Sequence, residues 1–333
     1  MSDTAILVEG LAKRFGDVVA LDGIDFQVPA GSVFGLLGPN GAGKTTAIRI
    51  LTTILRPDGG RAEVLGLDVV RQADEVRYRI GLAGQYAAID PNLTGRENLQ
   101  LTGRLAQLPT ADARTRAAEL LERFELTDAG DRPARTYSGG MRRRLDVAAA
   151  LVQRPPVVFL DEPTTGLDIY SRNALWEMIR ELVAEGTTVL LTTQYLEEAD
   201  RLAHRIAVVD GGRVIADDSP TALKAQLGST VIELGMGGGT RAARAGELLA
   251  QRLDAQPERD GTTVRFTSDD GSRLLIDVLR LLDDQDLAPV TLAVRDPSLD
   301  DVFLALTGRR AEAEAAANGA RPGRRGARAR GAT

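Results

Sequence analysis

The sequence predicts an α/β fold: a central, mostly parallel sheet with an antiparallel β subdomain, an inserted helical subdomain and a small C-terminal α/β domain. The main observation is three continuous apolar runs of strand length, at residues 33–37, 157–160 and 188–191. Each run is followed by polar or glycine residues and then a helical pattern, which is typical of buried parallel strands and their crossover helices. The chain of 333 residues is long enough for one large domain and a smaller one.

Residues 5–35 predict the antiparallel subdomain. Apolar and polar residues alternate in AILVEGLAKRF and again in DFQVPAGSVFGLLG, which is the period of a half-buried strand. Between these two segments, LDGID at residues 21–25 supplies a glycine turn. We therefore expect two antiparallel strands joined at residues 21–25.

Residues 92–153 predict the helical subdomain, because this stretch contains no strand-like run. Thr94 and Glu97 have the spacing of a capping box ahead of an amphipathic segment. The segment ADARTRAAELLERF continues with apolar residues at helical spacing. The helices are therefore expected as an insertion between strands of the sheet.

The organisation changes near residue 219. SPTALKAQLG has the pattern of a capped helix, with Ser219 as N-cap, Pro220 in the first turn and Gly228 as terminator. Strand and helix patterns then alternate over residues 230–308, and residues 309–333 are low in complexity and rich in arginine. We expect a first domain of residues 1–228, a small α/β domain of residues 229–308 and a disordered tail of residues 309–333.

Composition excludes several classes of function. The chain has no cysteine, so thiolate metal sites and disulfides are excluded, and its single histidine, His204, argues against a histidine-based metal site or catalytic triad. We expect His204 to be structural. The net charge of −6 argues against nucleic acid as a partner. The sequence contains no run of 18 apolar residues, so no membrane span is predicted. Of the 41 basic residues only three are lysines, and the others are arginines. The presence of a lysine at position 44 therefore suggests a site that needs a slim ammonium group.

Residues 38–46, GPNGAGKTT, have the spacing of a phosphate-binding loop between a strand and a helix. The glycines allow a tight turn whose N–H groups point at a phosphate, and the following helix directs its positive end to the same place. Lys44 can reach the β- and γ-oxygens, and the Thr45 hydroxyl can bind Mg²⁺. The expected ATP-binding residues are Gly38, Pro39, Asn40, Gly41, Ala42, Gly43, Lys44, Thr45 and Thr46.

Residues 157–163, VVFLDEP, place two carboxylates at the C-terminal edge of a buried strand, where ligands bind in open α/β sheets. Asp161 suits the Mg²⁺ role. Glu162 is positioned to polarise an attacking water as general base. Acidic residues at a strand end are often only a solvated loop, but their combination with the phosphate loop favours catalysis.

These segments, with four others in the same order, resemble the ATP-binding subunits of ABC transporters. YSGGM at residues 137–141 is similar to the family's signature motif, GLAGQY contains the glutamine of the Q-loop, and GLD at residues 166–168 is similar to the D-loop. In the family, the signature clamps the γ-phosphate held by the opposite subunit, and the Q-loop glutamine contacts Mg²⁺ or water. An aromatic residue near the start of the chain stacks on adenine, although a phenylalanine there could also belong to the core. The resemblance assigns these roles to Ser138, Gly139 and Gly140 (signature), Gln85 (Q-loop), Asp168 (D-loop) and Phe15 (adenine).

Two residues depart from the family pattern. Met141 replaces the last glutamine of the signature, and Gln194 stands where the family has a histidine that contacts the γ-phosphate. The Gln194 amide can still donate a hydrogen bond to that oxygen, but it cannot become cationic. With Asp161 and Glu162 intact, we expect a working but slow ATPase, with Glu162, Gln194 and Gln85 as its catalytic residues.

Gln194, YSGGMRRRLD and the closing PSLDDVFLALTG narrow the resemblance to ATPases of the daunorubicin-resistance type, over about residues 5–308. That resemblance implies a homodimer of ATPase subunits bound to a separate integral-membrane permease, on the cytoplasmic side of the cell membrane. It also implies efflux of a hydrophobic drug or antibiotic. Lipid, polysaccharide or peptide cargo remains an alternative, as does a non-transport ABC ATPase. The C-terminal domain either stabilises the dimer or caps the sheet, and the arginine-rich tail either contacts anionic lipid or is only solvated.

Overall fold

The computed structural model describes residues 4–84, 89–227, 230–252, 257–268 and 271–306, with side chains from 274 onward in the last range. The chain divides into two compact units, Met1–Pro220 and Thr221–Thr333. The expected boundary after residue 228 stays a prediction, because residues 228–229 lie outside the described ranges. The predicted terminator Gly228 and the tail of residues 309–333 lie outside them too.

An antiparallel sheet forms the N-terminal part of the first unit, with strand order β2-β1-β4-β5. The expectation of antiparallel strands is confirmed, but the expected turn at residues 21–25 is wrong. The chain turns at Gly16 and Asp17, and Gly23 lies inside the second strand, where the pairing register shifts. Gly23 has a φ of 73°, so its left-handed backbone accommodates this bulge instead of a turn. The strands are β1 (Thr4–Phe15), β2 (Val18–Pro29), β4 (Gly59–Val64) and β5 (Leu67–Asp68).

The central sheet has the order β10-β9-β3-β8-β7-β6. All neighbours pair in parallel except β10 and β9, which are antiparallel. The three apolar runs of the sequence become β3, β7 and β8, and every residue of these strands is buried. The prediction of a mostly parallel buried sheet is therefore confirmed. The strands are β3 (Val33–Leu37), β6 (Ile80–Ala83), β7 (Val157–Asp161), β8 (Thr188–Thr193), β9 (Arg205–Asp210) and β10 (Arg213–Asp218).

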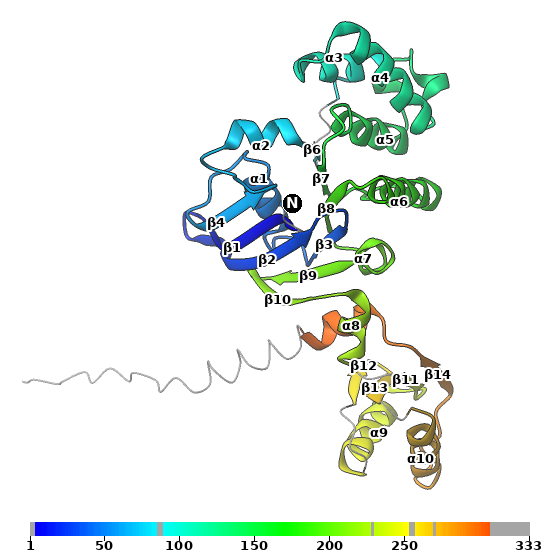
Figure 1. Ribbon diagram of the computed structural model, residues 1–333. Coiled ribbons are helices and arrows are strands. Elements are labelled where there is room, and N and C mark those ends of the chain that lie inside the picture. Colours follow the sequence, from blue (N-terminus) through cyan, green and yellow to red (C-terminus); the bar gives the residue numbers. More distant parts are fainter. Residues whose placement is uncertain (1–3, 85–88, 228–229, 253–256, 269–270, 307–333) are drawn as a thin grey trace, which may run out of the picture. The chain divides into compact units, whose positions relative to one another are not determined.

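The helices of the first unit form two groups (Figure 1). The helices α3, α4 and α5 lie together as the helical insertion, and α3 begins with the predicted capping box of Thr94 and Glu97. The other helices accompany the two sheets. The bounds are α1 (Lys44–Leu51), α2 (Ala73–Arg79), α3 (Gly95–Leu105), α4 (Thr110–Arg123), α5 (Gly139–Ala150), α6 (Ile169–Ala184) and α7 (Leu196–Leu202), with 3₁₀ turns at Thr127–Ala129 and Ala134–Thr136.

One hydrophobic core joins the two sheets of the first unit. It combines side chains of the antiparallel sheet, such as Ile6 and Phe26, with Phe34 and Phe159 of the central sheet and Ile48 of α1. The rings of Phe26 and Phe34 stack with their centroids 5.2 Å apart. Because α1 is packed into this core, the loop that precedes it is held at the edge of the central sheet.

The second unit is a small α/β domain. Two helices supply apolar residues, among them Leu249 and Val278, that pack with Ile232, Leu234 and Phe266 of its sheet. The sheet is antiparallel, with order β12-β13-β11-β14, and residues 299–306 are helical. The second unit begins within α8 (Pro220–Ala225), and its further elements are β11 (Thr230–Gly235), α9 (Gly239–Arg252), β12 (Glu258–Asp260), β13 (Thr263–Ser268), α10 (Gly271–Asp283) and β14 (Thr291–Arg295).

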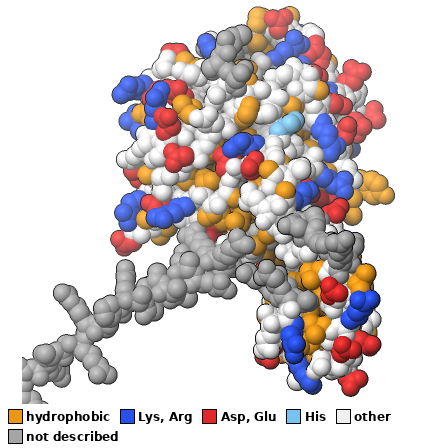
Figure 2. Space-filling view, turned by 60° about the horizontal axis from the view of Figure 1, so that its bottom comes forward, with side chains coloured by type: hydrophobic (Ala, Val, Ile, Leu, Met, Phe, Trp, Pro, Cys, Tyr) orange, Lys and Arg blue, Asp and Glu red, His pale blue; other side chains and the backbone are white. Residues whose placement is uncertain are grey.

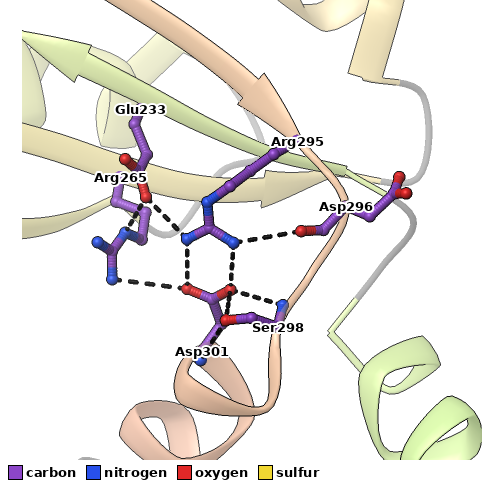
Figure 3. Close-up of polar contacts among 6 residues, drawn as sticks. All are labelled: Glu233, Arg265, Arg295, Asp296, Ser298 and Asp301. Carbon is purple, nitrogen blue, oxygen red and sulfur yellow. Dashed lines mark hydrogen bonds and ion pairs between the residues drawn. The ribbon is translucent and has the colours of Figure 1, made fainter. Parts of the chain in front are cut away.

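The segment PSLDDVF contains a capping box that fastens the last described helix to this sheet. Ser298 N–H and Oγ donate to Asp301 Oδ2 at 2.8 and 2.7 Å, and Asp301 N–H donates back to Ser298 Oγ at 3.3 Å. Arg295 binds both Asp301 oxygens, at 2.6 and 2.9 Å, and also reaches Glu233. In Figure 3, Glu233, Arg265 and Arg295 project from three neighbouring strands toward Asp301. Burial would raise the pKa of Asp301, but hydrogen bonds from Arg295 and Ser298 lower it to about 2.

Arginines on the surface are commonly matched by acidic neighbours. Figure 2 shows a face on which acidic, basic and apolar side chains are interspersed. Exposed pairs of this kind include Arg205 with Asp217 at 2.6 Å and Arg213 with Asp22 at 2.7 Å. Among the residues that the structure describes, no helix is long and apolar enough to cross a membrane.

Candidate active site

The site lies where three parallel strands end side by side. In the register of the sheet, Leu37 of β3 pairs with Thr193 of β8, and Thr192 pairs with Asp161 of β7. The segments that follow these strands are the phosphate loop, the residues after Thr193 and the Glu162 loop. Parallel alignment therefore brings three segments that are distant in the sequence to one edge of the sheet.

The phosphate loop requires glycine at two crowded positions. Gly43 has a φ of 111°, and a side chain there would collide with the Ala20 carbonyl oxygen. A side chain at Gly38 would collide with the Val209 carbonyl oxygen. These contacts hold the loop against β2 and β9 just before α1 begins. A pocket at this point is lined by Val18, Ala20, Asn40, Gly41, Gly43, Lys44, Thr45, Thr46 and Glu162.

Lys44 lies inside the loop, with its side chain 3% exposed. Its ammonium donates to the carbonyl oxygens of Gly38 at 2.7 Å and Pro39 at 3.0 Å, and Nζ lies 3.9 Å from Glu162 Oε1. Burial lowers the pKa of Lys44, and the nearby Glu162 and Asp161 carboxylates oppose this effect. A negative phosphate at the loop would add charge-assisted hydrogen bonds to this ammonium.

Asp161 is held by two hydroxyls at the end of β7. Thr192 Oγ1 donates to Asp161 Oδ1 at 2.6 Å, and Thr45 Oγ1 donates to the same oxygen at 3.2 Å. Among the described residues, no three or more His, Cys, Asp or Glu side chains converge as a metal site. A Mg²⁺ ion that binds together with phosphates needs only one or two carboxylates, so the Thr45 and Asp161 oxygens suit such an ion.

Glu162 follows Asp161 in a strained conformation. Its φ of 48° lies in the left-handed region, which costs a residue other than glycine about 1–3 kcal/mol. Its N–H group donates to Thr192 Oγ1 at 2.9 Å and to the Thr192 carbonyl oxygen at 3.2 Å. The side chain is 10% exposed and lies beside Lys44. Thr192 therefore fixes both acidic residues, a role that sequence reasoning missed.

The signature segment begins α5, and Ser138 is its N-cap, accepting the Met141 N–H at 3.2 Å. Gly139 has open space around the position of a side chain, whereas a Cβ at Gly140 would lie 2.5 Å from Ser171 Oγ. Ser171 donates through N–H and Oγ to Asp168, which is the N-cap of α6. The structure thus brings Gly140 and Asp168 together through Ser171, a contact that neither motif predicts alone.

Phe15 lies at the end of β1 and is 50% exposed, so the alternative of a core phenylalanine is wrong. It pairs with Val18, which lines the pocket at the phosphate loop. Lys13 Nζ lies 5.6 Å from the centre of its ring. Stacking of Phe15 on adenine stays a prediction.

Gln194 directly follows β8 and is partly exposed, one residue beyond the pairing of Thr193 with Leu37. This position puts it beside the start of the phosphate loop. Gln85 lies outside the described residues, and its role stays a prediction. His204 Nδ1 accepts the Val33 N–H at 3.1 Å, and the backbone N–H of His204 donates to the Val33 carbonyl oxygen at 2.9 Å, which is a structural role between β3 and β9.

A buried acid beyond Gln194 was also missed. Glu198 is fully buried on α7, and the Trp176 indole donates to its Oε1 at 3.0 Å. Burial raises the pKa of Glu198, while hydrogen bonds from Thr193 and Trp176 oppose the rise. The sequence gives only a weak signal for this pair, because its members lie on different helices.

The fold and this edge of the sheet define a phosphate-loop ATPase with a signature helix. Residues 21–165 match the ABC transporter family. The chain is 56% identical to the daunorubicin resistance ATP-binding protein DrrA2 of Streptomyces coeruleorubidus, over 94% of this chain and 98% of that protein. It is 42% identical to the Nod factor export ATP-binding protein I of Ralstonia nicotianae, over 93% of this chain and 96% of that one. A dimeric ATP-binding cassette in a post-hydrolysis state with ADP and Pi has a TM-score of 0.60 and 25% identity, over 64% of this chain and 98% of that one.

The chain therefore belongs to the ABC transporter ATP-binding proteins, within the group of the daunorubicin and doxorubicin resistance proteins. It is an ABC-type ATPase. The expectations of the fold, the family and the enzyme class are confirmed.

Proposed function

We propose that this chain hydrolyses ATP to drive efflux of a hydrophobic drug or antibiotic through a separate membrane permease. The observation that carries the proposal is 56% identity to a daunorubicin resistance ATP-binding protein over 94% of the chain. The likeness extends through the C-terminal unit as well as the ATPase core, which favours the same kind of complex. The fold and the ATPase site do not define a cargo, so the drug class rests on this likeness.

Nucleotide binding is assigned to the phosphate loop. Residues 38–46 offer backbone N–H groups to the phosphates, and Lys44 exchanges its bonds to Gly38 and Pro39 for the β- and γ-oxygens. Phe15 and the neighbouring Val18 would receive the adenine ring. The burial of Lys44 supports this role, because a desolvated ammonium gains most from an anionic partner.

For hydrolysis, Thr45, Gln85 and Asp161 would hold Mg²⁺, which neutralises negative charge on the phosphates when it is bound. Glu162 polarises the attacking water as general base, from a position fixed by Thr192. The side-chain amide of Gln194 donates a hydrogen bond to an oxygen of the γ-phosphate. Because an amide carries no positive charge, transition-state stabilisation is weaker than with a cation, and turnover is slow.

Coupling would use two copies of the chain in a homodimer. Ser138, Gly139 and Gly140 of one copy would close on the γ-phosphate held by the other, and Asp168 would lie at the interface. Closure on ATP and reopening after hydrolysis would move the helices of the permease. The chain would then act as a peripheral protein on the cytoplasmic side of the cell membrane.

A second cargo class is supported by the 42% identity to a Nod factor export protein over 93% of the chain. A lipid, polysaccharide or peptide cargo would use the same ATPase, because the permease selects the cargo. The lower identity ranks this candidate behind drug efflux.

The test is affinity purification of the Glu162→Gln variant, trapped with ATP, from detergent-solubilised membranes of its own cell. We expect a stoichiometric multi-helix membrane protein among the co-purifying proteins, identified by mass spectrometry. Recovery of ribosomes, DNA-associated proteins or no partner would contradict a transporter. Co-expression of the recovered partner then distinguishes the cargoes: the wild-type pair, but not the Glu162→Gln pair, should lower the retention of daunorubicin in cells.

A further inference from the structure

Arg143 joins the signature helix to the Glu162 loop. It lies on α5, and its guanidinium donates to the Asp161 carbonyl oxygen at 2.9 Å and to the Pro163 carbonyl oxygen at 2.9 Å. These are the carbonyl groups of the residues on either side of Glu162. A third bond reaches the Gly84 carbonyl oxygen at 2.6 Å, just beyond the end of β6. One side chain thus bonds three backbone carbonyls from two separate segments.

The charge of Arg143 is balanced inside the protein. The Asp146 carboxylate, which is 2% exposed, accepts from Arg143 Nη1 at 3.0 Å. Arg143 itself is only 13% exposed. Burial lowers the pKa of Arg143, and the Asp146 and Asp161 carboxylates oppose the effect. This pair is therefore a fixed internal contact, unlike a flexible surface ion pair.

Glu162 needs such support because its backbone is left-handed. Thr192 holds the Glu162 N–H from the side of β8, and Arg143 holds the adjacent carbonyls from the side of α5. The direction of the Glu162 side chain thus depends on two elements that meet only in the folded protein.

We infer that Arg143 is a positioning residue for Glu162, and that it makes the geometry of the general base depend on the placement of the signature helix. A planar guanidinium directs its N–H groups to all three carbonyls at once, which a lysine ammonium on its flexible stem cannot do. A shift of the signature helix therefore moves the carbonyls on both sides of Glu162. The inference deepens the proposed hydrolysis mechanism and rests on the role proposed there for Glu162.

The experiment measures kcat and KM for ATP with the purified full-length chain and its Arg143→Lys and Arg143→Met variants. We expect kcat to fall about 10- to 100-fold in both, since small displacements of a catalytic group cost this much. KM should stay within about threefold of the parent, because the phosphate-loop contacts do not involve Arg143.

Arg116→Met is the matched control. Arg116 is 16% exposed and, like Arg143, binds a carboxylate and a backbone carbonyl. It contacts Glu119 at 3.0 Å and donates to the Leu151 carbonyl oxygen at 2.9 Å, but it lies away from Glu162. A merely structural role of Arg143 predicts equal effects on kcat for Arg143→Met and Arg116→Met. Because Arg143→Met removes the opposite charge from the buried Asp146, the double variant Arg143→Met with Asp146→Ala tests the same point without that charge.

Two results would overturn the inference. The first is a kcat within threefold of the parent in a folded Arg143 variant. The second is an effect on ATP binding instead of turnover, which would appear as a KM raised about 10- to 100-fold with kcat unchanged. The Glu162→Gln variant separates this failure from failure of the mechanism. If Glu162→Gln keeps the parental kcat, the role of Glu162 itself is wrong; if it is inactive while Arg143→Met is active, only the positioning role is wrong.

Discussion

Thr192 and Asp161 share a short hydrogen bond at the active site, with 2.6 Å between Thr192 Oγ1 and Asp161 Oδ1. The same hydroxyl accepts the Glu162 N–H at 2.9 Å. One threonine therefore orients the carboxylate proposed for Mg²⁺ and the backbone of the proposed general base. It does so from the neighbouring strand, 31 residues away from Asp161 in the sequence.

Thr192→Val should lower kcat about 10- to 100-fold, because valine keeps the shape of threonine but removes the hydroxyl that fixes Asp161 and Glu162. Thr188→Val is the control, since Thr188 lies on the same strand and its buried hydroxyl bonds the Gly31 N–H at 2.9 Å, far from the site. Thr192→Val loses two side-chain hydrogen bonds and Thr188→Val loses one, and each lost bond costs about 1 kcal/mol of stability. Steady-state ATPase rates should separate them, and equal rates would contradict the role of Thr192.

Gln194→Ala should remove most ATP turnover while ATP binding survives, because the amide is proposed to act on the γ-phosphate and not on the adenine or the phosphate loop. Gln194→His should raise turnover above the parent, since an imidazolium can stabilise negative charge that an amide cannot. The checks are kcat from phosphate release and the dissociation constant of a fluorescent ATP analogue. Unchanged turnover in Gln194→Ala would exclude a switch role for Gln194.

Gly140→Ala should destabilise the protein, because the new Cβ would lie 2.5 Å from Ser171 Oγ. Gly139→Ala meets no atom within 4 Å and should raise the melting temperature, since alanine favours the helix over glycine by about 1 kcal/mol. Thermal unfolding of both variants tests the contrast. Adding Ser171→Ala should restore part of the stability of Gly140→Ala, and failure of this rescue would mean that the contact with Ser171 is not the cause.

Glu198→Gln should stabilise the protein at pH 8 but not at pH 4. The pKa of Glu198 is raised in the folded state. When the pH lies above the ordinary pKa of glutamate, the unfolded chain therefore releases a proton that the folded chain keeps. The contribution of Glu198 to stability therefore falls as pH rises through this window. Glutamine is neutral at every pH and still accepts from Trp176. Thermal unfolding between pH 4 and 8 is the measurement, with the exposed Glu197→Gln as control, and a pH-independent gain would refute the explanation.

Asp301→Asn should destabilise the second unit at pH 6. The pKa of Asp301 is lowered to about 2 from an ordinary value of 3.8, so its contribution of about 2 kcal/mol is present above pH 3.8 and is lost as pH falls toward 2. Hydrogen exchange of residues 291–306 in the full-length chain, followed by mass spectrometry, should show faster exchange in Asp301→Asn than in Asp300→Asn. Asp300 is the exposed neighbour. Equal exchange in the two variants would show that the Arg295–Asp301 contact does not hold the helix.

Much of the fold follows from the sequence, because its signals are local. A buried strand is a continuous apolar run, as in residues 157–160, and the Thr94–Glu97 box marks the start of a helix within four residues. The prediction of a hairpin turn at residues 21–25 was wrong, because a glycine with a left-handed backbone fits both a turn and a bulge. Only the pairing of β2 with β1 decides that Gly23 is in a bulge.

The phosphate loop, the acidic strand end and the signature segment are determined by the sequence alone, since each is a short pattern whose backbone conformation demands particular residues. Their mutual geometry is decided by the tertiary structure. Parallel pairing of β7 with β8 brings Thr192 to Asp161, and packing of α5 against β6, the neighbour of β7, brings Arg143 to the carbonyls on either side of Glu162. Such contacts join residues 18 to 31 positions apart, and they depend on strand register and helix packing, which no short segment encodes.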